Sequence, residues 1–148
     1  MSCCGYRWSL NQSSSQDDQQ WNLWNGAVFI DFDSKFYYYQ HPKEIVDYGT
    51  YINHFVQSVL MKDFKDTFLF AQVSSSGLSC HFVFYFDCQH TKDHFVQACS
   101  AAYDAFCISY RKYDKKADEI MATPKVMDSC GTRPTQLLSL SNYPIIIK

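Results

Sequence analysis

The sequence has little of what marks several classes of protein. Among its 148 residues are only 5 glycines and 4 prolines, too few for a collagen-like or low-complexity chain. Lys and Arg number 13 against 15 Asp and Glu, so the formal net charge of -2 gives no general attraction to nucleic acid or to an anionic bilayer. We therefore expect no nucleic-acid partner.

Long apolar runs are also missing. The longest, over residues 68–71 and 82–86, fall far short of the roughly 20 residues of a membrane-spanning helix, which predicts a chain without a transmembrane segment. The first ten residues contain one basic residue and no apolar stretch, so no secretory signal is expected. Since 7 cysteines cannot all pair within one chain, a reduced, cytoplasmic protein is predicted.

The sequence contains no familiar motif for a metal, a cofactor or catalysis. Cys3 and Cys4 are adjacent, Cys80 and Cys88 lie eight apart, and no C-x-x-C pair occurs, so no metal and no cofactor are expected. None of the 5 histidines belongs to a G-x-S-x-G, H-E-x-x-H or G-x-x-x-x-G-K motif. We expect no enzymatic activity; a small thiol-dependent enzyme is an open alternative that cysteine alkylation tests.

What the chain does have is apolar and aromatic side chains, 47% and 18% of all residues, which is enough for one core. Its composition predicts a polar N-terminal arm over residues 1–26, a domain over 27–116 and a flexible tail over 117–148. Trp21 and Trp24, at the end of the arm, are interpreted as core anchors.

Aromatic and β-branched runs separated by turn residues predict a meander of antiparallel strands. Asp33-Ser34 and Ser74-Ser75-Ser76-Gly77 are the expected turns, and residues 61–67 form a charged turn. Ile52, Val56 and Leu60 share one face if their segment is extended. The expected strands span residues 27–32, 35–40, 44–48, 51–60, 68–73 and 78–86.

One long amphipathic helix is predicted after the strands. Thr91 is a suitable N-cap, and Asp93 suits the first turn. The helix covers the phenylalanine face of the preceding strand, so the expected class is α+β: an antiparallel meander sheet, or partly open barrel, capped by a long C-terminal helix. Its apolar stripe, spaced by three or four residues, is Phe95, Cys99, Ala102, Phe106, Tyr110 and Tyr113.

The order of these elements over residues 27–116 resembles a phosphotyrosine-binding (PTB) domain, which has a pleckstrin-homology-like (PH-like) fold. The family begins with a strand and a helix that have no counterpart before Ala27, so the resemblance is to an N-terminally shortened domain. The pieces that carry it are residues 55–60, Thr67-Phe68-Leu69-Phe70-Ala71, Cys80-His81-Phe82-Val83-Phe84 and the helical Ala102-Tyr103-Asp104-Ala105-Phe106.

The resemblance implies a noncatalytic intracellular adaptor that adds NPxY-type peptides to a strand edge. Such peptides come from the cytoplasmic tails of membrane receptors or signalling proteins. Phosphotyrosine recognition requires cations, preferably Arg, and no Arg occurs from Trp8 to Tyr110, so binding without phosphorylation is expected. Carried over by position, the peptide-binding residues are Ile52, Asn53, His54, Phe55, Val56, Gln57 and Ser58 on the edge, and Cys99, Tyr103, Phe106 and Tyr110 on the helix.

Two interpretations stay open beside this one. Cys99, Phe106 and Tyr110 lie on the main apolar stripe and are expected to be buried against the sheet, whereas Tyr103 lies off it and favours a groove. A PH-like lipid or protein-binding module is the alternative function. Phosphoinositide binding by such a module requires a basic loop between early strands, where Asp31, Asp33 and Lys35 give the wrong charge balance.

Overall fold

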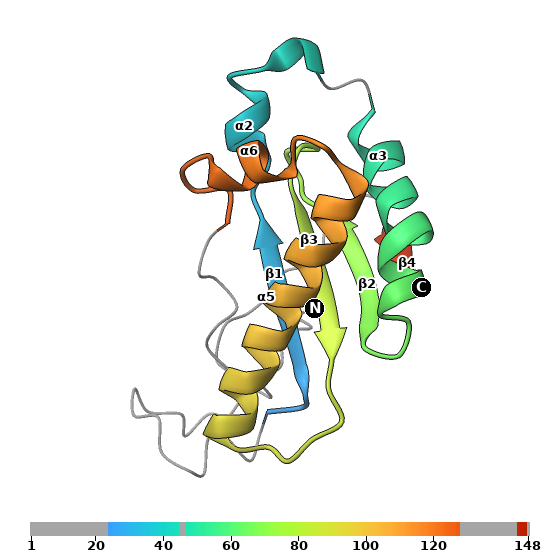
Figure 1. Ribbon diagram of the computed structural model, residues 1–148, viewed down its shortest axis with the longest axis vertical. Coiled ribbons are helices and arrows are strands. Elements are labelled where there is room, and N and C mark those ends of the chain that lie inside the picture. Colours follow the sequence, from blue (N-terminus) through green and yellow to red (C-terminus); the bar gives the residue numbers. More distant parts are fainter. Residues whose placement is uncertain (1–23, 45–46, 128–144, 148) are drawn as a thin grey trace.

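The protein folds around one open antiparallel sheet with a long helix across it (Figure 1). This computed structural model describes residues 24–44, 47–127 and 145–147. The sheet has the order β1-β3-β2-β4, and the expected α+β class with one long helix is confirmed. Its strands are β1 (Ala27–Phe32), β2 (Phe68–Val73), β3 (Cys80–Tyr85) and the three-residue β4 (Ile145–Ile147).

The helices fall into two groups along the chain. The first group lies between β1 and β2 and comprises α2 (Lys35–Tyr38), the 3-10 helix η1 (Pro42–Glu44), α3 (Tyr48–Phe55), the π-helix η2 (Val56–Leu60) and α4 (Met61–Asp63). The second group follows β3 and comprises α5 (Lys92–Tyr113) and α6 (Ala117–Ala122). None of the helices in the described ranges is long and apolar enough to span a membrane.

The β2–β3 hairpin forms where the sequence predicts it. Ser74 N–H donates to Ser79 O at 2.8 Å, and Gly77 N–H donates to Ser74 O at 2.9 Å. Gly77 has a φ of 75°, which glycine adopts without steric penalty. On β3, the alternating side chains of Phe82 and Phe84 are fully buried, as expected for the face that meets the helix.

The start and the packing of α5 also follow the prediction. The Thr91 side chain caps the helix by accepting a hydrogen bond from His94 N–H at 3.2 Å. The Phe106 ring lies 4.9 Å from the Phe82 ring and 5.1 Å from the Phe32 ring, measured between centroids. Aromatic side chains from β1, β3 and α5 therefore build the centre of the core.

The region between β1 and β2 differs from the prediction, because its described part is helical rather than extended. Its aromatic and β-branched composition favours strands, but tertiary contacts override that preference. Ser34 Oγ donates to Leu78 O at 2.6 Å and lies 2.6 Å from the Tyr48 hydroxyl, which ties the start of this region to the hairpin. The strands expected over residues 35–40 and 51–60 are therefore wrong. The strand expected over 44–48 is wrong at residues 44, 47 and 48, and residues 45 and 46 lie outside the described residues.

The spacing of apolar residues explains the error in α3 and η2. The Asp47 side chain caps α3 by accepting from Thr50 N–H at 3.2 Å. Ile52, Val56 and Leu60, interpreted as one strand face, are four residues apart and form a fully buried helical stripe. A spacing of four fits both periodicities, and the cap decides between them.

The tail expected over residues 117–148 is packed in its first part. Ala117, Ile120 and Val126 are buried in the core. Asp33 N–H donates to Val126 O at 2.9 Å, and the backbones of Met127 and Phe32 form an isolated antiparallel β-bridge. The flexible tail is therefore wrong for residues 117–127 and for β4, while residues 128–144 and 148 lie outside the described residues.

Trp24 anchors the start of the described chain, as predicted. Its side chain is fully buried, and its indole Nε1 donates to Ala27 O at 2.8 Å. Its ring meets the Phe95 ring edge-on, with centroids 5.1 Å apart. Trp21 and the rest of the predicted arm up to residue 23 lie outside the described residues.

Candidate peptide-binding site

The predicted peptide-binding edge is a helix. Residues 52–58 lie in α3 and η2, where the backbone N–H and C=O groups bond within the helix. Ile52, Phe55 and Val56 are fully buried in the core. Since a helix offers no row of free backbone groups, strand addition at residues 52–58 is wrong. The exposed or half-exposed members of the segment are Asn53, His54, Gln57 and Ser58.

The four candidate residues on α5 divide between core and surface. Phe106 and Tyr110 are fully buried, because they lie on the stripe that packs against the sheet. Cys99 is half-buried, and Tyr103 keeps 45% of its surface exposed. The expectation that Tyr103 lies away from the main stripe is therefore confirmed.

An extended segment of the chain already lies on the outer edge of β2. β4 pairs with this edge in antiparallel orientation, although the two strands are more than 70 residues apart in sequence. This is the geometry of strand addition, in which main-chain hydrogen bonds hold an extended segment on a sheet. The paired residues are Phe70 with Ile147, Ala71 with Ile146 and Gln72 with Ile145.

The hairpin fixes which backbone groups face this edge. Ser74 N–H donates to Ser79 O, so the backbone groups of Ser74 point toward β3. Backbone groups alternate in direction along a strand, so those of Gln72 also point toward β3 and those of Ala71 point toward β4. Ala71 and Ile146 are therefore the hydrogen-bonding pair at the centre of the contact.

The β2 edge extends beyond the part that β4 covers. β4 pairs with Phe70, Ala71 and Gln72, half of the six-residue strand. The register between β2 and β3 shifts between Phe68 and Phe70, and the intervening Leu69 is 39% exposed. A ligand longer than three residues therefore has further backbone and an apolar side chain to contact.

The other outer strand, β1, is protected at both ends. Ala27 N–H donates to Asn25 Oδ1 at 3.0 Å, and Ala27 O accepts from Trp24 Nε1. At the other end, Asp33 N–H donates to Val126 O. Because these contacts use edge groups at both ends, β2 is the better candidate edge.

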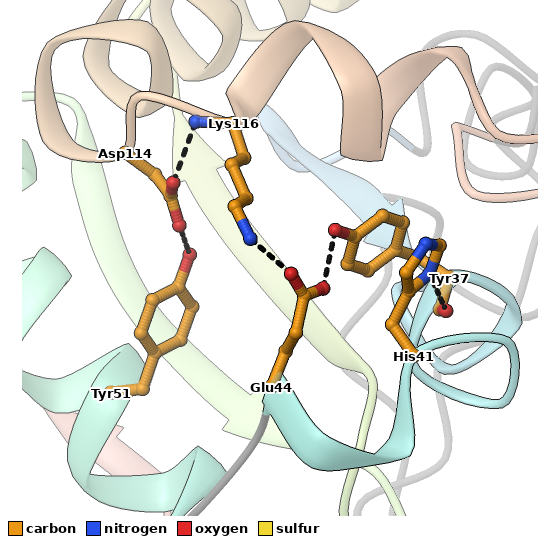
Figure 2. A network of polar contacts seen from close by, with 6 residues as sticks. All are labelled: Tyr37, His41, Glu44, Tyr51, Asp114 and Lys116. Atoms are coloured by element: carbon orange, nitrogen blue, oxygen red, sulfur yellow. Dashed lines mark hydrogen bonds and ion pairs between the residues drawn. The ribbon is translucent and has the colours of Figure 1, made fainter.

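A polar network fastens the helical region to the end of α5 (Figure 2). The Tyr51 hydroxyl donates to Asp114 Oδ2 at 2.6 Å, and Lys116 N–H donates to Asp114 Oδ1 at 2.8 Å. The Lys116 ammonium pairs with Glu44, which also accepts from the Tyr37 hydroxyl at 2.5 Å. The network holds η1 and α3 against the α5–α6 turn and is structural.

The electrostatics of this network keep its groups in fixed protonation states. Hydrogen bonds from Lys116 and Tyr37 hold the pKa of Glu44 below its ordinary value. Burial and the hydrogen bond to Glu44 raise the pKa of the Tyr37 phenol, and burial with the neighbouring Tyr110 raises that of Tyr51. At neutral pH the phenols are therefore neutral donors and Glu44 is an anion.

The described cysteines do not have the properties of nucleophiles. Burial raises the pKa of Cys80, Cys88, Cys99 and Cys107, so their thiols are protonated at neutral pH. Within the described ranges, no three His, Cys, Asp or Glu side chains are placed to hold a metal ion.

A carboxylate and a histidine meet across β1 and β3. His81 Nε2 lies 3.1 Å from Asp31 Oδ1, and the two residues are direct partners in the strand register. Burial, followed by the charge of Asp31, raises the pKa of Asp33. The cross-strand pair of Asp31 and His81 has opposite charges, which stabilise the pairing of β1 with β3, when the imidazole carries a second proton.

Two elements of the structure, β4 and α6, lie in the region that was predicted to be a flexible tail. Ile145-Ile146-Ile147 is a β-branched run, a strand signal that its place after Pro144 obscured. Ala117 and Ile120, three residues apart, are the helical signal of α6. α6 contributes Asp118, Met121 and Ala122 to a pocket that it shares with Tyr103.

Comparison of the chain with protein-family models, with curated proteins and with solved structures finds no match.

Proposed function

We propose that the protein is a noncatalytic adaptor module that binds extended peptides by strand addition to the outer edge of β2. The observation that carries the proposal is the pairing of Ile145–Ile147 with Phe70, Ala71 and Gln72. An edge that takes an extended segment of its own chain has the backbone geometry to take another. The expected ligands are segments of cytoplasmic tails.

The same edge favours peptides without phosphate. Lys62 and Lys65 lie in the connection before β2, but they alternate with Asp63 and Asp66. Asp63 is itself paired with Lys112 at 2.9 Å. Since phosphotyrosine requires concentrated positive charge, NPxY-type or other extended peptides are proposed to bind without phosphorylation. The order β2, β3, α5 supports a PH-like relationship as part of this proposal.

The test uses the chain shortened by residues 145–148, which leaves the β2 edge without β4. The probe is a fluorescein-labelled peptide of residues 141–148, followed by fluorescence anisotropy. Because Ile146 is the residue bonded to Ala71, N-methylation of Ile146 is expected to abolish binding. N-methylation of Ile145 and Ile147, whose backbone groups point away from β2, is the matched control and is expected to leave binding intact.

Equal loss of binding with both methylation patterns, or no loss with either, would contradict strand addition. Plain and phosphorylated NPxY peptides are titrated in parallel. A strong preference for the phosphorylated form would contradict the proposed independence from phosphate.

A further inference from the structure

A pocket lies between α5 and α6, on the opposite side of the molecule from the β2 edge. The segment after α6 contacts β1 through Val126 and Met127, and β1 lies at the other end of the sheet order from β4. Figure 1 shows α6 near α2 and β1, whereas α3 and β4 lie on the other side. The pocket has a volume of about 510 Å³ and is lined by Tyr103, Asp104, Cys107, Arg111, Asp118, Met121 and Ala122.

The walls of this pocket are held by the fold. Ala117 and Ile120 bury the inner face of α6 in the core. On the outer face, Arg111 Nε donates to Asp118 Oδ1 at 2.7 Å, which links α5 to α6 across the pocket. The inner face of α6 is therefore fixed on the core before a ligand binds.

The charges of the pocket favour a cation. Two carboxylates, Asp104 and Asp118, face one guanidinium, that of Arg111. The guanidinium is already used by Asp118. Asp104 is exposed and makes no ion pair within the described part of the chain, so the pocket has one uncompensated negative charge.

The remaining lining suits a long side chain with an apolar stem. Met121, Ala122 and Cys107 offer soft or apolar surface, and the half-exposed Tyr103 ring offers a π-face. Burial raises the pKa of the Tyr103 phenol, so this ring stays neutral at physiological pH. Cationic side chains combine such a stem with a charged head.

We infer that the α5–α6 pocket binds an arginine side chain presented by a partner protein. The planar guanidinium stacks on Tyr103 and donates to the Asp104 carboxylate, while its methylene stem lies along Met121. Arginine is favoured over lysine because the guanidinium pairs with a carboxylate through two parallel N–H groups and stacks on aromatic rings. The site is independent of strand addition at β2.

The test uses the full chain, labelled with nitrogen-15, and follows backbone amide shifts in NMR spectra. The probe is N-acetyl-arginine methylamide, and the uncharged control is N-acetyl-citrulline methylamide, which has nearly the same shape. The arginine probe is expected to shift amides of residues 103–111 and 118–122 and to bind at least about fivefold more tightly than the citrulline probe.

Substitutions in the pocket test which side chains contact the arginine probe. Asp104→Asn is expected to weaken arginine binding by about threefold to fivefold, whereas Asp87→Asn, an exposed carboxylate in the loop after β3, should leave it unchanged. Tyr103→Phe keeps the ring and should retain binding, and Tyr103→Leu should weaken it. Spectra of the free variants verify that each is folded.

Three results would overturn the inference. One is equal binding of the arginine and citrulline probes at this site, and another is an absence of shifts in α5 and α6. The third is preferential binding there of N-acetyl-glutamate methylamide, which would show that Arg111 leaves Asp118 to take an anion.

Discussion

The hydroxyl groups of Tyr51 and Tyr110 lie 2.6 Å apart, and Tyr51 donates its hydrogen to Asp114. Tyr51 comes from α3, Tyr110 from the last turns of α5, and Asp114 directly follows α5. One phenol therefore connects two helices with the turn that leads to α6. The helical region and the helix that covers the sheet are held together by polar groups that are partly buried.

Tyr51→Phe is expected to lower the free energy of unfolding by about 1–3 kcal/mol, because it leaves the Tyr110 hydroxyl and the Asp114 carboxylate without their shared partner. Urea unfolding measures the change. Tyr39→Phe, at a tyrosine that is 62% exposed, is the control and should change stability by less than about 0.5 kcal/mol. Equal losses in the two variants would mean that the hydrogen bonds do not stabilise the fold.

Glu44→Gln is expected to destabilise the protein at neutral pH, with an effect that fades in acid. The folded-state pKa of Glu44 is lowered by Lys116 and Tyr37, so its contribution is present above its ordinary value of 4.5 and is lost as pH falls through the lowered pKa. Urea unfolding of both proteins, from neutral pH down to about pH 3, measures the difference.

The control for this pH dependence is Asp87→Asn, at an exposed carboxylate in the loop after β3 that has no ion pair within the described part of the chain. This variant should differ little in stability from the unchanged protein at each pH of the series. A Glu44→Gln difference that stays constant into acid would contradict the linkage.

The sequence predicted correctly the two elements, α5 and the β2–β3 hairpin, that are marked by local patterns of residues. The α5 helix follows from the three-and-four spacing that includes Phe106, together with the Thr91 cap. The β2–β3 hairpin follows from the turn that ends at Gly77. In each case the preference of the segment and its tertiary partners favour the same structure.

The predictions are wrong where the preference of a segment for strand or helix disagrees with its tertiary contacts. The segment around Ile52 and Val56 is aromatic and β-branched, yet burial on one face of a capped helix decides its structure. The placement of Ile146 beside Ala71 depends on a contact between segments far apart in sequence, which no local pattern encodes. The candidate site is therefore the outer edge of β2, which the sequence did not predict, and not residues 52–58.

The thiol-dependent alternative predicts a reactive cysteine, whereas the structure predicts slow alkylation. Burial raises the pKa of Cys99 to about 12 and also raises that of Cys80. At neutral pH we expect iodoacetamide to modify both at least about a hundredfold more slowly in the folded chain than in urea. Mass spectrometry of proteolytic fragments measures each site. Faster modification of Cys80, Cys88, Cys99 or Cys107 in the folded chain would support a thiol nucleophile.

Alanine substitutions at two glycines distinguish the cost of backbone strain from the cost of a steric clash. Gly26 and Gly77 have φ of 90° and 75°, so alanine is strained at either position. At Gly26 an added Cβ would also lie 2.7 Å from Phe86 O, whereas at Gly77 it would meet open space. Gly77→Ala should therefore cost about 1 kcal/mol of unfolding free energy, and Gly26→Ala about 2–3 kcal/mol.

Urea unfolding curves of both variants decide whether the close approach to Phe86 adds to the strain. Phe86 N–H donates to Gly26 O at 2.9 Å, so the Cβ cannot be accommodated without disturbing this bond at the start of β1. If the two variants lose the same stability, the start of β1 moves freely enough to accommodate a methyl group. That result would contradict the tight pairing of β1 with β3 from which the core is built.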